Sequence, residues 1–282
     1  MNDARSIAAG WLADGRAAWL VELAEVRGSA PRAAGTRMAV AADAVAGTIG
    51  GGHLELEAIG LARQALAAFA DPRAASRAAP FERRYALGPA LGQCCGGAVL
   101  LRFAPLDALA LACWPRIEPR FWLQLHGAGH VGRAIIRVLE TLPCEVDWID
   151  EREEEFAIAS AERDHRPLPP HIRAICVDAP AAEVARLPAG GFVLAMTHSH
   201  DLDFAIVEAA LRRQDAGFVG LIGSATKRAR FERRLRARGM PEDQVARLAC
   251  PIGIESIAGK EPEVIAVAVA AQLLMAAERR PA

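Results

Sequence analysis

The sequence predicts an α/β protein in which a doubly wound parallel sheet forms the C-terminal part and a smaller α+β domain precedes it. Two observations carry this prediction. From residue 121 onward, short apolar runs alternate with helix-like segments, a pattern typical of a parallel sheet with helices on both faces. The first apolar run leads into a glycine motif, a helix-like segment, a second apolar run and an acid, which is the order of a mononucleotide-binding βαβ unit. We place the N-terminal domain at residues 1–116 and the C-terminal domain at residues 117–282.

The glycine motif makes the C-terminal domain Rossmann-like. Gly127 allows a tight turn, Gly129 lets the backbone approach a phosphate closely, and Gly132 lets the helix pack against the strand. These glycines, with His130 among them, precede a helix whose N-terminal amides attract an anion. Asp150 lies eighteen residues after Gly132, where an acid that binds a ribose is expected. The motif therefore predicts a site for a dinucleotide or another phosphate-bearing ligand.

The other elements of the C-terminal domain follow from the same alternation. The predicted strands cover 121–126, 145–149, 172–177, 192–197 and 217–222, and the predicted helices cover 132–142, 201–213, 226–238 and 262–279. Ligands of such sheets bind outside the carboxyl ends of the strands. The loops that follow the strands are therefore the candidate sites.

The N-terminal domain is expected to combine short strands with one helix. Apolar stretches at 19–26 and 36–41 flank a loop rich in glycine, alanine and arginine, which predicts two strands around that loop. A glycine-rich segment at 47–53 runs into a predicted helix over 54–70. A third apolar run covers 98–103, and a proline-punctuated linker is expected between 105 and 119.

Imidazoles and carboxylates gather in the loop after the strand predicted at 192–197. His198, His200 and Asp201 fall within a few residues of one another, and such a set can contact a polar ligand. The spacing of the two histidines does not aim both in one direction, so we expect no dedicated metal site. The alternative is that Asp201 caps the next helix while the histidines are solvated.

A second loop with polar and charged side chains follows the strand predicted at 217–222. Ser224, Lys227 and Arg228 place a hydroxyl and two cations at a helix start, which suits an anion. The basic run continues to Arg238, but its apolar residues recur with helical period. Most of its arginines are therefore expected on a solvated face.

Among the six cysteines, the adjacent pair Cys94 and Cys95 is the strongest candidate for reactive thiols. Gly92, Gly96 and Gly97 flank them, so the backbone is open to a soft ligand or a sulfur species. The alternative is that they are buried small hydrophobes.

Composition excludes several classes of partner. The 282 residues carry a net charge of −1 with a pI near 6.7, so no electrostatic footprint for nucleic acid or an anionic membrane is expected. The N-terminus lacks the apolar core of a secretory signal, and the apolar segment 264–277 is too short to span a bilayer. We therefore expect a cytoplasmic protein whose six cysteines are free thiols.

Taken together, eight motifs resemble one known family. They read GSAPRAAGTRM, GTIGGGHLE, LGQCCGG, HGAGHVG, DWIDEREEEF, MTHSHDLDF, LIGSATKRARF and CPIGI. In this order, from about residue 20 to residue 270, the set is similar to the XdhC/CoxI family of xanthine dehydrogenase accessory proteins.

The resemblance implies an accessory factor rather than an enzyme. Such a factor binds molybdenum cofactor (molybdopterin), shields it while the terminal sulfur is installed, and delivers it to apo xanthine dehydrogenase. A cysteine desulfurase is the implied sulfur donor, and a homodimer is compatible with this role. Cys94 or Cys95 would then approach the molybdenum, while the two helix-start loops would hold the phosphate.

Two other functions compete with this interpretation. The glycine motif and Asp150 also fit an NAD(P)-dependent oxidoreductase, in which His198 or His200 would have to move protons. The cysteine pair and the His/Asp loop also fit a thiol-redox or metal-binding protein. Nucleotide titration and elemental analysis would distinguish them.

Overall fold

The structure, a computed structural model, describes residues 4–68, 79–87 and 97–279 of the chain. It divides into two compact units, Asn2–Ile117 and Glu118–Ala282, which we describe separately. Cys94 and Cys95 lie outside the described residues. The mixed α/β fold class predicted from the sequence is confirmed.

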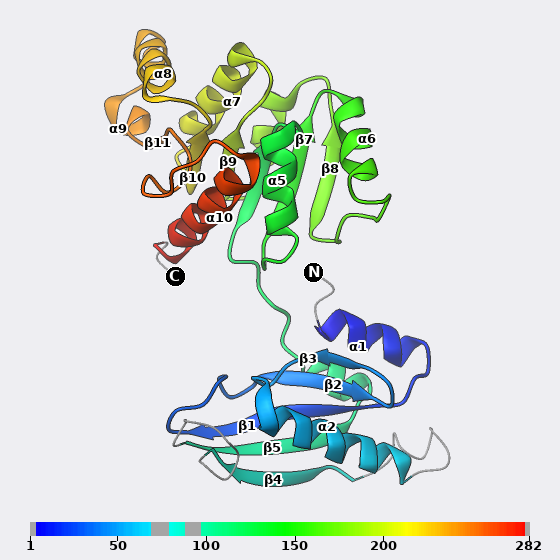
Figure 1. Cartoon of the computed structure of the whole chain (residues 1–282). Helices are drawn as coiled ribbons and strands as arrows, with labels where there is room; N and C mark the ends of the chain where they lie inside the picture. Colours follow the sequence, from blue (N-terminus) through cyan, green and yellow to red (C-terminus); the bar gives the residue numbers. More distant parts are fainter. Residues whose placement is uncertain (1–3, 69–78, 88–96, 280–282) are drawn as a thin grey trace. The chain divides into compact units, whose positions relative to one another are not determined.

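The N-terminal unit contains an antiparallel sheet of five strands in the order β3-β2-β1-β5-β4 (Figure 1). All of its pairings are antiparallel. The strands are β1 (Ala18–Arg27), β2 (Arg37–Ala41), β3 (Val45–Gly47), β4 (Phe81–Ala86) and β5 (Ala98–Pro105).

Apolar residues on both faces of β1 explain the layers of this unit. Trp19 and Val21 pack with helix α2 (Gly52–Ala67) on one face. Leu20 belongs to a second core on the other face, with α1 (Ala4–Ala13) and α4 (Ala108–Ala112). Successive strand residues point to opposite faces, so the apolar first four residues of β1, Ala18–Val21, are buried on both sides of the sheet.

The C-terminal unit contains a parallel sheet of six strands in the order β11-β10-β9-β6-β7-β8. Every pairing is parallel. The strand order reverses between β6 and β9, and this reversal marks the position where doubly wound folds bind ligands. The strands are β6 (Trp122–His126), β7 (Glu145–Asp150), β8 (Ile172–Cys176), β9 (Phe192–Ala195), β10 (Phe218–Leu221) and β11 (Leu248–Ala249).

Helices cover both faces of this sheet (Figure 1). One core joins the sheet to α5 (His130–Leu139), α6 (Glu153–Ala161) and α10 (Pro262–Glu278). The other joins it to the 3₁₀ helix η2 (Pro180–Arg186) and to the helices α7 (His200–Arg212), α8 (Ala225–Ala237) and α9 (Glu242–Val245).

Several elements were not expected from the sequence. The segment Ala4–Ala13 is helical, Phe81–Ala86 is a strand, and Glu153–Ala161 is a helix that begins with three glutamates. The linker expected between 105 and 119 contains the short helix α4. The predicted helices and strands of the C-terminal unit are present with ends shifted by at most two residues, apart from the end of α5, which lies three residues earlier than predicted.

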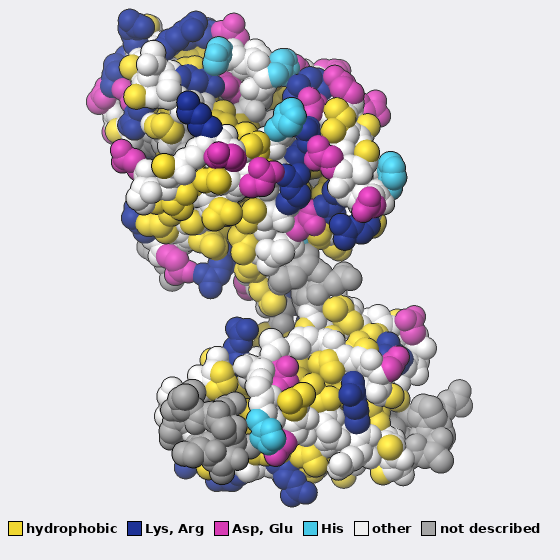
Figure 2. Space-filling view, in the orientation of Figure 1, with side chains coloured by type: hydrophobic (Ala, Val, Ile, Leu, Met, Phe, Trp, Pro, Cys, Tyr) yellow, Lys and Arg dark blue, Asp and Glu magenta, His cyan; other side chains and the backbone are white. Residues whose placement is uncertain are grey.

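No helix in the described part of the chain has both the length and the apolar character needed to cross a membrane. On the face seen in Figure 2, cationic and acidic side chains are intermixed.

Candidate functional site

The glycine loop between β6 and α5 leaves room for side chains at only one of its three glycines. Gly127 has a φ of +126°, and a Cβ there would lie 2.4 Å from the carbonyl oxygen of Met196. A Cβ at Gly132 would lie 2.1 Å from the carbonyl oxygen of Gly127. Both positions therefore require glycine, since backbone atoms cannot yield as a flexible side chain would.

Gly129 differs because a Cβ there would meet nothing within 4 Å. It is the N-cap of α5, and it supplies no side-chain hydrogen bond to the first turn. The space above the helix start is therefore open, and the first-turn amides receive no cap from this residue. Such a helix start favours an anion. His130, the next residue, is exposed beside it.

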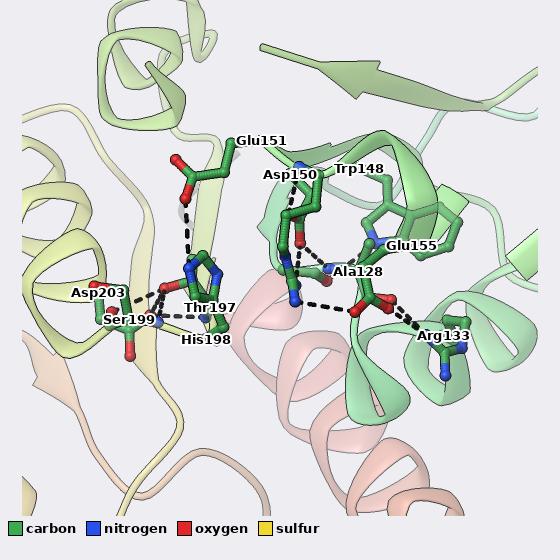
Figure 3. Close-up of polar contacts among 12 residues, drawn as sticks. Ala128, Arg133, Trp148, Asp150, Glu151, Glu155, Thr197, His198, Ser199 and Asp203 are labelled. Carbon is green, nitrogen blue, oxygen red and sulfur yellow. Dashed lines mark hydrogen bonds and ion pairs between the residues drawn. The ribbon is translucent and has the colours of Figure 1, made fainter. Parts of the chain in front are cut away.

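Asp150, the acid expected to bind a ribose, is 3% exposed and already fully hydrogen-bonded (Figure 3). Its Oδ2 accepts hydrogen bonds from the Ala128 amide at 2.6 Å and from Arg152 Nη2 at 2.9 Å. Its Oδ1 accepts from Arg152 Nε and from the Arg152 amide, both at 3.0 Å. Burial alone would raise the pKa of this carboxyl, but these hydrogen bonds hold it below its usual value.

The network continues from Arg152 along α6 and back to the glycine loop. Arg152 Nη1 donates to Glu155 at 2.9 Å, and Glu155 accepts a second hydrogen bond from Arg133 at 2.6 Å. Arg133, buried in α5, also donates to the Ala128 carbonyl at 2.9 Å. Glu155, in the first turn of α6, thus fixes the geometry of the loop, a role that the sequence analysis missed. The sequence did indicate a partner for Asp150, because Arg152 lies only two residues after it.

The loop after β9 is organised by Asp203. This buried carboxylate accepts hydrogen bonds from the amide and the hydroxyl of Thr197 at 2.7 and 2.9 Å. The cap of α7 is Ser199, whose hydroxyl accepts from the Leu202 amide. The alternative in which Asp201 caps the helix is therefore wrong; Asp201 is exposed and pairs with Arg234 at 2.7 Å. Ser199 takes the cap because its extended backbone directs the hydroxyl at the first turn.

The two histidines of this loop lie at the surface. His198 Nε2 lies 3.5 Å from a carboxylate oxygen of Glu151, the residue after β7. His200 contributes to a hollow of about 480 Å³ at the start of α8, together with Ser224, Lys227 and Arg230. Among the residues that the structure describes, no group of three or more potential metal ligands comes together.

The loop after β10 contacts the loop after β9. Ser224 caps α8 by accepting from the Lys227 amide. The Lys227 ammonium lies 2.7 Å from Asp203, so its charge is paired inside the fold. Arg228 donates to Glu232 and to the Cys250 carbonyl. The structure thus brings the predicted loops of β9 and β10 together, and it leaves His200 and Ser224 facing the hollow.

Three motif loops also meet within the N-terminal unit. A Cβ at Gly50 would lie 2.7 Å from Pro31, and a Cβ at Gly97 would lie 2.3 Å from the carbonyl oxygen of Ser29. Glu55, which the sequence analysis did not single out, accepts hydrogen bonds from the amides of Ile49 and Gly51. The residue that follows the cysteine motif is therefore packed against the loop between β1 and β2.

Comparison with known proteins gives consistent matches over both units. The family model described as the XdhC Rossmann domain matches residues 123–273, and the model of the XdhC and CoxI family matches residues 11–72. An uncharacterized Escherichia coli K12 protein, YqeB, is 29% identical over 266 residues, which are 93% of this chain and 44% of that protein. The chain thus spans less than half the length of this curated relative.

A solved structure has the same fold. It is a Bacillus halodurans protein described as a xanthine dehydrogenase, with a TM-score of 0.75 and 18% identity, and the match covers 99% of this chain and 97% of that one.

Proposed function

Since the chain belongs to the XdhC and CoxI family, we propose that it is a maturation factor for xanthine dehydrogenase. In this proposal it binds molybdenum cofactor, protects it while a cysteine desulfurase supplies the terminal sulfur, and delivers it to the apo-enzyme. The protein acts by binding and release rather than by turnover.

One observation carries the binding part of this proposal, namely the open start of α5 above Gly129. Molybdopterin carries a phosphate, and a helix start with uncapped amides stabilises such a group. The hollow lined by His200, Ser224 and Lys227 at the start of α8 is the second candidate for an anion. Both helix starts follow strands whose carboxyl ends lie at the same edge of the parallel sheet.

The thiols are assigned to the metal end of the cofactor. Thiolate sulfur is a soft ligand that suits a dithiolene-bound molybdenum centre. Cys94 and Cys95 lie outside the described residues, but Gly97 is anchored against Ser29, and Leu87 donates to its carbonyl at 2.7 Å. These contacts hold one end of the cysteine segment beside the loop between β1 and β2.

The binding proposal is tested by replacing Gly129 with valine. The backbone there has a φ of −68°, which any residue adopts, and an added Cβ meets no protein atom within 4 Å. The variant should fold normally and lose most of its molybdopterin, measured as the fluorescent oxidation product per protein after co-expression.

Gly60→Val is the matched control, since a Cβ at this helical glycine also meets nothing within 4 Å. It should retain wild-type molybdopterin content. Equal content in the wild type and Gly129→Val would contradict a role of the α5 start in binding.

The cysteines are tested by the same measurement. Cys94→Ala, Cys95→Ala and the double variant should co-purify with less molybdopterin than the wild type, because a soft ligand to the metal is lost. Wild-type content in all three variants would remove the thiols from the site.

An NAD(P)-dependent oxidoreductase is the second candidate, favoured by the imidazole–carboxylate contact between His198 and Glu151. Such a contact orients the imidazole, as a general base requires. Fluorescence titration with NADH and NADPH, followed by a turnover assay, distinguishes the two functions: micromolar binding with turnover would favour the enzyme.

A further inference from the structure

Asp150, the acid that is hydrogen-bonded to the glycine loop, has no acceptor capacity left for a ligand. An ionised carboxylate offers about four acceptor sites on its two oxygens. On Asp150 these are used by the Ala128 amide, the Arg152 amide and two guanidinium nitrogens of Arg152. A ribose diol, which must donate its hydroxyl protons to this acid, would find each oxygen already in use.

Arg152 is the group that a ligand meets instead. Its side chain is 25% exposed, whereas that of Asp150 is 3% exposed. A guanidinium carries five N–H donors, and each of its three nitrogens donates one hydrogen bond to Asp150 or Glu155. The remaining N–H groups can donate to an acceptor on a ligand, such as a phosphate or carbonyl oxygen. The position therefore offers donors where a ribose needs an acceptor.

The guanidinium is held in this orientation from two sides. Nε and Nη2 of Arg152 donate two parallel hydrogen bonds to the Asp150 carboxylate, and Nη1 donates to Glu155. Glu155 is itself held by buried Arg133, which also binds the Ala128 carbonyl of the glycine loop. Displacing Arg152 would break its bidentate ion pair with Asp150 and remove one hydrogen bond from the Glu155 carboxylate. Replacing Arg152 by a ribose diol would therefore cost considerable free energy.

We infer that Arg152 is the specificity-determining residue beside the glycine loop: it excludes ligands with an unmodified ribose diol and selects ligands that bring an acceptor to this position. The inference goes beyond the proposed function, because it holds for any phosphate ligand of the α5 start.

The test uses ADP-ribose, which combines a pyrophosphate for the helix start with a ribose diol for Asp150. Isothermal titration of the full-length protein should show no binding, or binding in the millimolar range, for the wild type. Arg152→Ala should bind at least tenfold more tightly, because the Asp150 oxygens are released while the amides of Ala128 and residue 152 still hold the carboxylate. Adding Asp150→Asn to Arg152→Ala should abolish the gain.

Arg173→Ala is the matched control. Arg173 pairs with Asp147, another acid of β7, at 2.7 Å, so its removal deletes one cation beside the same strand but leaves the contacts of Asp150 intact. It should bind ADP-ribose as the wild type does. If Arg152→Ala does not fold, Arg152→Lys provides the test, since it keeps the charge, loses the fork, and should show a smaller gain.

Equal affinity of the wild type and Arg152→Ala would overturn the inference, as would a gain that persists in Asp150→Asn/Arg152→Ala. The probe contains no pterin, so these outcomes are independent of the molybdopterin measurements on Gly129→Val.

Discussion

His126 shows how a single residue can make folding depend on pH. It ends β6 with 0% of its surface exposed, and neither ring nitrogen has a hydrogen-bond partner in the described part of the chain. Burial lowers the pKa of this imidazole to about 3, because a charged ring in the sheet core has no solvation. The ring is therefore neutral in the folded protein across the physiological range.

The consequence is a loss of stability in acid. In the unfolded chain His126 binds a proton below its pKa of 6.5, whereas in the folded protein it stays neutral down to about pH 3. The free energy of unfolding therefore falls as pH decreases through this window. From pH 7 to pH 5 the contribution of His126 falls by about 2 kcal/mol. Urea unfolding of the wild type and His126→Leu at both pH values measures it. The variant should lose less stability by that amount, and parallel pH profiles would show that His126 is not responsible.

Arg152 and Asp203 show the limit of sequence analysis at this scale. Glycines such as Gly127 and Gly132 were assigned correctly because a sharp turn and a close backbone approach leave only one choice of residue. The partners of Asp150 and Lys227 were not found, because a motif indicates where a charge is and not which charge neutralises it. Lys227, expected at an anion, has its ammonium against Asp203, 24 residues earlier in the chain.

At the scale of elements, the ion pair between Asp203 and Lys227 ties the start of α7 to the start of α8. The carboxylate is 1% exposed, and it also holds the amide and hydroxyl of Thr197 at the end of β9. One side chain thus fixes both loops that border the hollow near His200.

Asp203→Ala should therefore destabilise the protein by about 3 kcal/mol, because the variant leaves a largely buried ammonium without its counter-charge and the Thr197 amide without its acceptor. Asp201→Ala is the control on the same helix turn. Asp201 is 83% exposed, and its ion pair is expected to contribute little. Chemical denaturation compares the two variants, and equal midpoints would show that the buried pair does not hold the loops.

The same scale explains which elements were predictable. Apolar runs such as 121–126 and helices with a clear apolar face were found by their period. α6 was missed because its residues, EEEFAIASA, lack a helical apolar stripe. Its first turn is instead specified by charge, through the contacts of Glu155 with Arg152 and Arg133. β3 and β11, of three and two residues, are too short to show any period.

At the scale of the whole molecule, the chain combines two units that each present a helix start capped by glycine. In the N-terminal unit the N-cap of α2 is Gly51, and in the C-terminal unit the N-cap of α5 is Gly129. A Cβ at either position would meet nothing within 4 Å. Described residues of both units therefore place a helix that begins at a glycine beside a family motif, but the start of α2 already has the Glu55 carboxylate on the Gly51 amide, so the start of α5 is the one that suits an external anion.

In the proposed function the protein acts through its client, so the last prediction concerns xanthine dehydrogenase. The enzyme made without this protein should retain its flavin and iron–sulfur clusters, which are inserted by other routes, but lack sulfurated molybdenum cofactor. Absorption spectra, molybdenum content and xanthine oxidation measure these three properties. Adding the wild-type protein with a cysteine desulfurase and molybdopterin should restore activity. Gly60→Val should restore it equally and Gly129→Val poorly, because only the second variant fills the space above the α5 start. Full xanthine oxidation and normal cofactor content in the absence of this protein would refute the maturation role.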